Sequence, residues 1–292
     1  MSPRSQAGPN AFSARLLPAL VIAVSLGCAD ATAGLDTGIQ SPWVDATNSK
    51  VRLISGSAED DGAPALFAGV QIRLDEGWKT YWRNPGDSGV PPSFDWSGSK
   101  NLKEAQVLYP APHRFADASG VAIGYSGEVV FPVRVTPKRP GEPVELKLTV
   151  DYGLCKNLCI PNEALLTLEL PPHLSSRDDN PVLNRFLALV PRPTEPGQLP
   201  TIRKIDAKLT GDKPRLIIDT EFPANVGGND LFIESSDVFI PVPKRAGPSD
   251  GGKRRYAVVF SSPAEAERIK GKTLTLTLVY RGGARETSWT AE

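Results

Sequence analysis

The segment VELKLTVDYGLCKNLCIPNEALLTLEL (residues 144–170) has the pattern of two β-strands joined by a turn, with a pair of cysteines at the turn. Apolar side chains alternate with polar or charged ones over residues 144–152, and the alternation returns over residues 164–170. A period of two residues is typical of strands that bury one face. The segment therefore predicts a hairpin with Cys155 and Cys159 at its mouth.

The spacing of Cys155 and Cys159 requires the chain to reverse between them. In a straight strand, residues four apart lie about 13 Å from one another, since each residue advances the chain by roughly 3.3 Å. A disulfide needs Cα atoms within about 4.4–6.8 Å. Gly153 and Asn157 tolerate turn conformations, and Pro161 fixes the exit from the turn. We therefore expect the two cysteines to be able to close a small disulfide ring.

A disulfide in so small a ring adds little to stability. Loop-closure entropy gives about 2 kcal/mol for a ring of about five residues, and a structural staple gains more by joining distant segments. A short ring at a loop tip is also easy for the thiolate of another protein to reach. Thiol–disulfide exchange is therefore favoured over a structural bond, and either Cys155 or Cys159 could be the attacking sulfur.

Residues 1–33 have the features of a secretory signal peptide. Arg4 and Arg15 precede the apolar run LLPALVIAVSL (residues 16–26), and small residues follow up to an Ala-x-Ala exit at Ala33. The run is shorter than the roughly 20 residues that cross a membrane as a helix. We therefore expect cleavage after Ala33, with Ala31 as the second choice, and export of the mature chain.

Export bears on the cysteines, because compartments outside the cytoplasmic membrane permit disulfides. If Cys28 leaves with the signal peptide, Cys155 and Cys159 are the two cysteines that remain. Two cysteines with none left over are the number needed for one disulfide. Cys28 follows Leu-Gly, so lipid anchoring at Cys28 is the alternative. Ser25 disfavours it, since a lipobox usually has a larger apolar residue at that position.

Charge and composition exclude several classes of function. The chain has 33 Lys and Arg against 33 Asp and Glu, so it lacks the basic excess that binds nucleic acids or anionic membranes. We expect no nucleic-acid partner. No Gly-rich phosphate loop occurs, and neither of the two histidines accompanies the motif of a hydrolase nucleophile.

Beyond the hairpin, the chain is rich in glycine (26) and proline (28) and has little helical periodicity. Short alternating segments separated by turn residues predict an all-β fold built from β-sandwiches. The expected strands cover residues 65–74, 129–135, 144–154, 164–170, 215–221, 231–234, 256–261 and 273–281.

A break between two domains is expected at residues 171–200, since Pro171-Pro172 ends a strand there. Asn180 before Pro181 is typical of a helix start and predicts a short helix over 181–190. The segment PRPTEPGQLP (191–200) is a semi-rigid linker by composition, and Ser262-Pro263 predicts a second short helix. The expected division is a first sandwich at 34–175, helix and linker at 176–200, and a second sandwich at 201–292.

An aromatic cluster with Arg83 precedes a predicted turn at residues 84–89. Its other members are Trp78, Tyr81 and Trp82. Such a cluster could bind a sugar or a peptide. Packing in the core of the sandwich is the simpler interpretation and is preferred.

A copper site is a further candidate, because thiolates and imidazoles both bind copper. His173 should lie at the far end of the hairpin from the cysteines, His113 cannot be placed, and no methionine other than Met1 occurs. We therefore predict no metal site and no cofactor.

Three blocks of the sequence resemble one known family. DYGLCKNLCIPNEA (151–164) resembles the cysteine hairpin of the amino-terminal domain of the thiol:disulfide interchange protein DsbD, and most closely its ScsB-like relatives, which share this spacing. GWKTYWRNPGDSGVPPSFDW (77–96) and YPAPHRFADASGVAIGYSGEVVFPV (109–133) resemble the same family. The blocks cover about residues 45–172, and residues 200–292 resemble the additional β-domain of the ScsB-like branch.

The resemblance implies two immunoglobulin-like β-sandwich domains in tandem, located in the periplasm. It implies that Cys155 and Cys159 cycle between dithiol and disulfide, as part of a protein-disulfide reductase. The family shields its cysteines with an aromatic residue of a cap loop, to which no residue of this chain is assigned. Tyr152 is a neighbouring aromatic that is more simply part of the core.

The resemblance also implies the partners. The domain accepts electrons from a membrane-embedded thiol reductant and passes them to periplasmic thioredoxin-like proteins, disulfide isomerases, cytochrome c maturation factors or proteins linked to copper tolerance. This chain has no transmembrane electron carrier or terminal thioredoxin domain, so the reductant is expected to be a separate chain. No small-molecule substrate is expected. The alternatives are a non-catalytic binding or chaperone module with a structural disulfide, and a copper(I)-handling protein that uses the same sulfurs.

Overall fold

The structure, a computed structural model, describes residues 39–60, 63–87, 89–117, 120–172 and 179–292. The predicted signal peptide, Cys28 and His173 lie outside these residues. Within the described ranges, no helix is long and apolar enough to cross a membrane.

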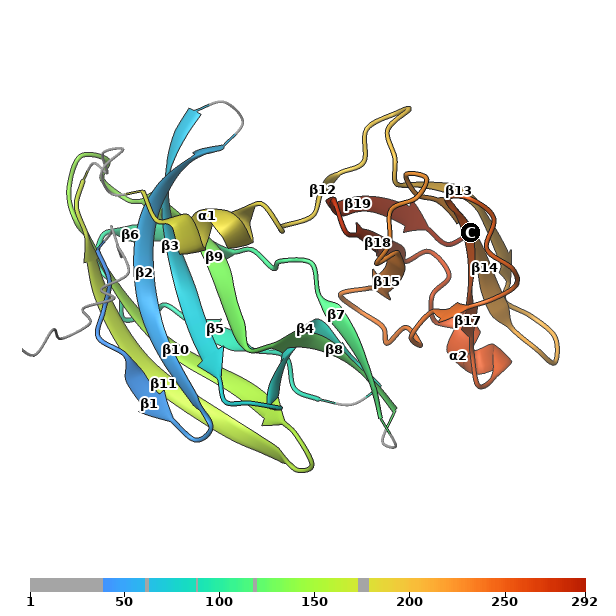
Figure 1. Ribbon diagram of the computed structural model, residues 1–292, viewed down its shortest axis with the longest axis horizontal. Coiled ribbons are helices and arrows are strands. Elements are labelled where there is room, and N and C mark those ends of the chain that lie inside the picture. The colour runs from blue at the N-terminus through green and yellow to red at the C-terminus, as the bar shows by residue number, and fades with distance from the viewer. Residues whose placement is uncertain (1–38, 61–62, 88, 118–119, 173–178) are drawn as a thin grey trace, which may run out of the picture. The chain divides into compact units, whose positions relative to one another are not determined.

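The described chain consists of β-sheets and two short helices, so the predicted all-β class is confirmed (Figure 1). The first sandwich has two sheets. One has the strand order β1 (Val44–Ala46), β2 (Ser49–Asp60), β3 (Ala63–Leu74), β9 (Glu128–Pro137), β6 (Leu102–Val107). The other has the order β11 (Cys159–Leu170), β10 (Val144–Cys155), β4 (Lys79–Gly86), β8 (Gly120–Ser126), β7 (His113–Asp117), and β5 (Ser93–Asp95) also pairs with β10.

The second sandwich has two four-stranded sheets. One has the order β12 (Arg192–Pro193), β19 (Gly283–Thr290), β18 (Thr273–Tyr280), β15 (Asp230–Glu234). The other has the order β13 (Thr201–Lys208), β14 (Arg215–Glu221), β17 (Lys253–Val259), β16 (Lys244–Arg245). The helix α2 (Pro263–Glu267) begins at Ser262, whose hydroxyl accepts a hydrogen bond from the backbone of Glu265, as the sequence predicts.

Each sandwich encloses an apolar core. In the first, alternate residues of β10 and β11 point inward, which confirms the predicted period of two. The largest fully buried side chains there include Trp82 and Phe131. In the second, Phe222 and Tyr256 are the largest. Trp82 is therefore part of the first core and Trp78 packs against that core, as the preferred interpretation of the sequence expects. Tyr81 and Trp82 lie within the strand β4, which continues into the expected turn.

The helix α1 (Pro181–Leu187) follows the first sandwich and packs on it. Asn180 is its cap, because the side-chain oxygen accepts hydrogen bonds from the backbone of Val182 (3.1 Å) and Leu183 (3.2 Å). Leu183 and Phe186 are buried in the first core. The helix is shorter than the predicted range 181–190, since turns replace the helix after Leu187.

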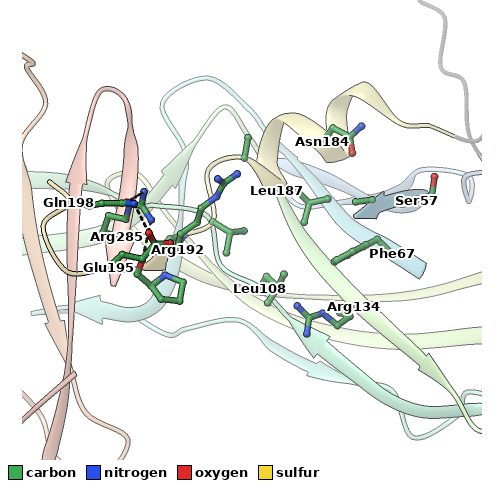
Figure 2. A pocket seen from close by; sticks show the side chains of 15 residues that line it. Ser57, Phe67, Leu108, Arg134, Asn184, Leu187, Arg192, Glu195, Gln198 and Arg285 are labelled. Atoms are coloured by element: carbon green, nitrogen blue, oxygen red, sulfur yellow. Dashed lines mark hydrogen bonds between the residues drawn. The ribbon is translucent and has the colours of Figure 1, made fainter. Parts of the chain in front are cut away.

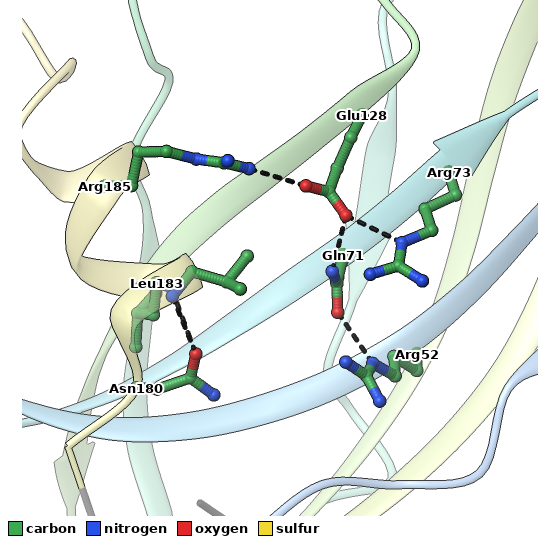
Figure 3. Close-up of polar contacts among 8 residues, drawn as sticks. Arg52, Gln71, Arg73, Glu128, Asn180, Leu183 and Arg185 are labelled. Atoms are coloured by element: carbon green, nitrogen blue, oxygen red, sulfur yellow. Dashed lines mark hydrogen bonds and ion pairs between the residues drawn. The ribbon is translucent and has the colours of Figure 1, made fainter. Parts of the chain in front are cut away.

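Glu128 links α1 to the sheet below it (Figure 3). Its carboxylate accepts hydrogen bonds from Arg73 (2.7 Å), Gln71 (2.8 Å) and Arg185 of α1 (2.6 Å). Gln71 is fully buried and accepts in turn from Arg52 (2.6 Å). Burial alone would raise the pKa of Glu128, but these hydrogen bonds outweigh it and hold that pKa below its ordinary value.

Charged side chains join strands of the two sandwiches. Arg83 of β4 binds Glu234 of β15 (2.5 Å) and Glu286 of β19. Arg114 of β7 donates two hydrogen bonds of 2.9 Å to the carboxylate of Asp230. These ion pairs are only partly exposed, so they hold the strands with more specificity than freely solvated pairs do.

Candidate functional site

The disulfide lies at the tip of the hairpin formed by β10 and β11. The ladder runs from Val144 opposite Leu170 to Cys155 opposite Cys159, so the cysteines are direct neighbours across the two strands. A disulfide joins them, with the Cα atoms 4.1 Å apart. The predicted reversal of the chain is thus confirmed. Gly153, expected in the turn, instead lies in the ladder opposite Pro161.

The strand β4 holds the other side of Cys155. In the ladder between β10 and β4, Cys155 is opposite Lys79 and Leu154 is opposite Thr80. The hydroxyl of Thr80 donates a hydrogen bond of 2.9 Å to the carbonyl of Gly153. Cys155 is therefore fixed between two strands and only half-exposed, whereas Cys159 lies on the outermost strand of its sheet and is exposed.

Tyr81 of β4 is the side chain that approaches the disulfide. Its ring is only 2% exposed, and its hydroxyl lies 3.4 Å from Cys159 Sγ. Two glycines make room for the ring: a Cβ on Gly89 would lie 2.2 Å from a ring atom, and one on Gly153 would lie 3.1 Å away. Sequence reasoning does not place Tyr81 at the disulfide, although Tyr81 belongs to the aromatic cluster before residues 84–89.

Tyr152, the other candidate aromatic, belongs to the core as the simpler interpretation had it. It is buried, and its hydroxyl shares a hydrogen bond of 2.8 Å with Ser49. Burial raises the pKa of Tyr152 above its ordinary value.

A small cavity adjoins the disulfide. Its volume is about 180 Å³, and both cysteines line it together with Tyr81 and two lysines, Lys79 and Lys156. The remaining lining residues are Thr80, Phe115, Ala122, Ile123 and Asn157. Leu158, which lies between the cysteines in the sequence, does not line the cavity and has 70% of its surface exposed.

A larger cavity of about 1170 Å³ lies elsewhere, between the first sandwich and the segment after α1 (Figure 2). Phe67 and Leu187 are among its apolar lining residues, and Arg285 donates a hydrogen bond to Gln198 (2.7 Å) at its edge. Phe67 lies seven residues before the end of β3, hence about 23 Å along the strand from the end nearest the disulfide. This cavity is therefore separate from the cysteines.

The two histidines are not both placed by the structure. His113 is exposed on β7, and His173 lies outside the described ranges. Among the residues that are described, no three His, Cys, Asp or Glu side chains gather in a group that could hold a metal ion.

Comparisons with known proteins found one family and one solved structure that are similar to this chain. Residues 62–171 match the family described as the thiol:disulfide interchange protein DsbD, N-terminal. The structure of the N-terminal periplasmic domain of ScsB from Proteus mirabilis matches with a TM-score of 0.66 and 21% identity, over 87% of this chain and 98% of that one. No curated protein matches the sequence. The resemblance predicted from the three sequence blocks is confirmed.

Proposed function

From the match of residues 62–171 to the amino-terminal family of the thiol:disulfide interchange protein DsbD, we propose that this chain exchanges disulfides with other proteins through Cys155 and Cys159. We place it in the periplasm, as the resemblance implies. There it relays electrons from a membrane-embedded thiol reductant to acceptors such as thioredoxin-like proteins and disulfide isomerases. It thus acts as a component of a protein-disulfide reductase.

The position of the disulfide is the observation that supports this proposal most. The bond joins residues that the ladder already makes neighbours, so it adds only the small entropy of a five-residue ring, about 2 kcal/mol. It also lies at an exposed hairpin tip. Neither the small ring nor the exposed position increases the stability that a structural disulfide provides. A disulfide that exchanges with other proteins, by contrast, must be accessible to them.

We further propose that Cys159 is the attacking sulfur. Cys159 is the more exposed of the two, and the hydroxyl of Tyr81 lies within reach to donate a hydrogen bond to its thiolate. In the reduced protein the Cys159 thiolate attacks one sulfur of an acceptor disulfide, and the other acceptor sulfur leaves as a thiolate. The Cys155 thiolate then attacks Cys159 Sγ, which restores the intramolecular disulfide and releases the reduced acceptor with two electrons gained.

The first test is the reduction potential of the pair, measured by equilibrating the mature protein in glutathione buffers and trapping free thiols. A potential between about −150 and −250 mV supports exchange, since glutaredoxins and protein disulfide isomerase lie in that range. A potential below about −300 mV is typical of structural disulfides. That result would favour the non-catalytic binding module instead.

The order of attack has its own test. Cys155→Ser keeps the proposed attacking sulfur but removes the one that resolves the mixed disulfide. We expect this variant to accumulate a mixed disulfide with an oxidised thioredoxin-like acceptor after prior reduction, seen as a shifted band without reductant. Cys159→Ser is the matched control and should form far less. Equal trapping by both variants would contradict the assignment.

A further inference from the structure

The small cavity beside the disulfide has only cations among its charged lining residues. Lys79 and Lys156 line it, and none of the described residues that line it is Asp or Glu. A cavity with charges of one sign concentrates ligands of the opposite sign. Its volume of about 180 Å³ is below the roughly 300–1,000 Å³ of pockets for drug-sized ligands, so it fits a group of about amino-acid size.

Lys79 is fixed next to the disulfide by the sheet. It lies opposite Cys155 in the ladder between β4 and β10. Its ammonium group lies over the ring of Phe115, 5.1 Å from the ring centre, and Phe115 is itself part of the cavity wall. The ring orients the ammonium group without neutralising it.

Lys156 supplies the second cation from the hairpin loop. Its ammonium group donates one hydrogen bond, of 3.1 Å, to the backbone carbonyl of Glu76. Gly77 leaves room for its side chain, since a Cβ at that position would lie 2.9 Å from Lys156 Cε. An ammonium group has three donors, so this contact positions the lysine and leaves its charge and further donors for a ligand.

We propose that this cavity is a carboxylate-binding subsite through which a low-mass thiol that carries a carboxylate, of the size of cysteine, exchanges with the disulfide. The inference rests on the proposed redox role of Cys155 and Cys159 and adds a class of co-substrate to the protein partners. The lysines bind the carboxylate, and the thiol group of the same molecule then lies beside the sulfurs.

The reaction balances with two equivalents of thiol. The thiolate of the first molecule attacks Cys159 Sγ, the disulfide breaks, and its electron pair leaves on Cys155 as a thiolate. The thiolate of the second molecule attacks the sulfur of the first, which forms the low-mass disulfide and releases the Cys159 thiolate. Two thiols are oxidised, the protein disulfide is reduced by two electrons, and the protons of the thiols pass to solvent and to the protein thiolates.

The test compares the rates at which three small thiols reduce the protein: mercaptopropionate (anionic), mercaptoethanol (neutral) and mercaptoethylamine (cationic). Each rate is divided by the rate of the same thiol with a small neutral disulfide, which removes differences in intrinsic reactivity. We expect mercaptopropionate to be favoured over mercaptoethanol by about tenfold and mercaptoethylamine to be disfavoured, at about threefold per lysine. The preference should shrink at high salt, and propionate should compete with mercaptopropionate.

Lysine variants test whether the preference for mercaptopropionate arises in the cavity. Lys79→Gln and Lys156→Gln should each reduce it about threefold, and the double variant should abolish it, while the corresponding Arg variants keep it. Lys213→Gln, an exposed lysine of the second sandwich, is the matched control and should change nothing. The rate with mercaptoethanol reports on whether each variant keeps an intact, reducible hairpin.

Two failures are distinguishable. If mercaptoethanol reduces the disulfide but mercaptopropionate has no advantage, or if the advantage survives in the double lysine variant, the carboxylate subsite is wrong and the exchange function stands. If no thiol reduces the disulfide and its potential lies below about −300 mV, the exchange function fails and the subsite fails with it.

Discussion

The hydroxyl of Tyr81 is the only polar group of a described side chain that the structure records within hydrogen-bonding distance of a cysteine sulfur. Tyr81→Phe keeps the ring and removes this donor, so the Cys159 thiolate should lose a hydrogen bond of roughly 1 kcal/mol. We expect the thiolate of the reduced protein to form at higher pH and the reaction with an acceptor disulfide to slow about fivefold. Thiolate absorbance against pH and stopped-flow kinetics measure both.

Tyr152→Phe is the control for this variant, because Tyr152 is also buried near the hairpin but bonds to Ser49. It should cost about 1 kcal/mol of stability and leave the reactivity of Cys159 unchanged. If Tyr81→Phe behaves like Tyr152→Phe in both measurements, the tyrosine only fills space.

The ring of Tyr81 depends on the absence of a side chain at Gly89. Gly89 has φ +125, and a Cβ there would overlap the ring of Tyr81. We expect Gly89→Ala to displace the ring and to raise the rate at which Cys159 reacts with a small thiol reagent. Gly127→Ala is the matched control, because Gly127 also has a positive φ (+71) but nothing lies within 4 Å of its Cβ position. Both variants should lose stability from the backbone, and equal reactivity in the two would contradict the role of the ring.

At the scale of single residues, the sequence predicted the cysteines but not Tyr81. The pair is visible because the two cysteines are close in sequence and flanked by alternating strands. Tyr81 and Cys159 are 78 positions apart. Their contact depends on β4 lying next to β10, and no local pattern determines that order of strands.

At the scale of elements, α1 depends on the protonation state of Glu128. The pKa of Glu128 is lowered in the folded protein, so the stability it contributes is present above its ordinary value of 4.5 and is lost as pH falls through the lower, folded value. We expect Glu128→Gln to lower the melting temperature at neutral pH and to have a smaller effect in acid. Melting temperature against pH, with the exposed Glu104→Gln as control, measures this.

An unchanged gap between wild type and Glu128→Gln across the whole pH range would contradict the role of the carboxylate. A gap that widens in acid would contradict the sign of the shift. Hydrogen exchange of the α1 amides locates the effect, because Arg185 is the residue through which Glu128 reaches the helix.

Strands were predicted best where one face is buried. β14 was predicted with its observed ends, and β10 was predicted to within one residue. β2 and β4 were missed for physical reasons. β2 is buried on both faces over residues 51–56 and ends in small and charged residues, so it has no clean alternation. β4 contains Asn-Pro-Gly and a shift of register after Tyr81, and that sequence is typical of a turn.

At the scale of the whole molecule, Arg114 is expected to couple the unfolding of the two sandwiches. Its two hydrogen bonds to Asp230 join β7 to β15. We expect Arg114→Ala to cost about 1.5–3 kcal/mol of interaction and to separate thermal unfolding, followed by calorimetry, into two transitions or broaden it. Arg255→Ala is the control, because Arg255 makes the same paired contact with Asp219 inside the second sandwich. A single, equally sharp transition in both variants would contradict the coupling.

The sequence did not predict the contacts between the sandwiches. Arg83 and Glu234 are 151 positions apart, and the chain offers 33 basic and 33 acidic residues as alternatives. Charge alone does not select among so many pairs. The order of the strands determines which charged residues meet. It places Tyr81 next to the disulfide and Trp82 in the core, and it brings Arg83 to Glu234 of the second sandwich.

The position of the disulfide separates insertions into two kinds. Cys155 and Cys159 face each other across the ladder with three residues between them. A residue inserted into that loop leaves the cysteines opposite each other, because hairpin loops of two to five residues all occur. A residue inserted into one of the strands instead moves side chains to the opposite face of the sheet. The distance between the cysteines in the sequence can therefore change through the loop without loss of the disulfide, whereas the strands that lead to it tolerate no single insertion unless a bulge absorbs it.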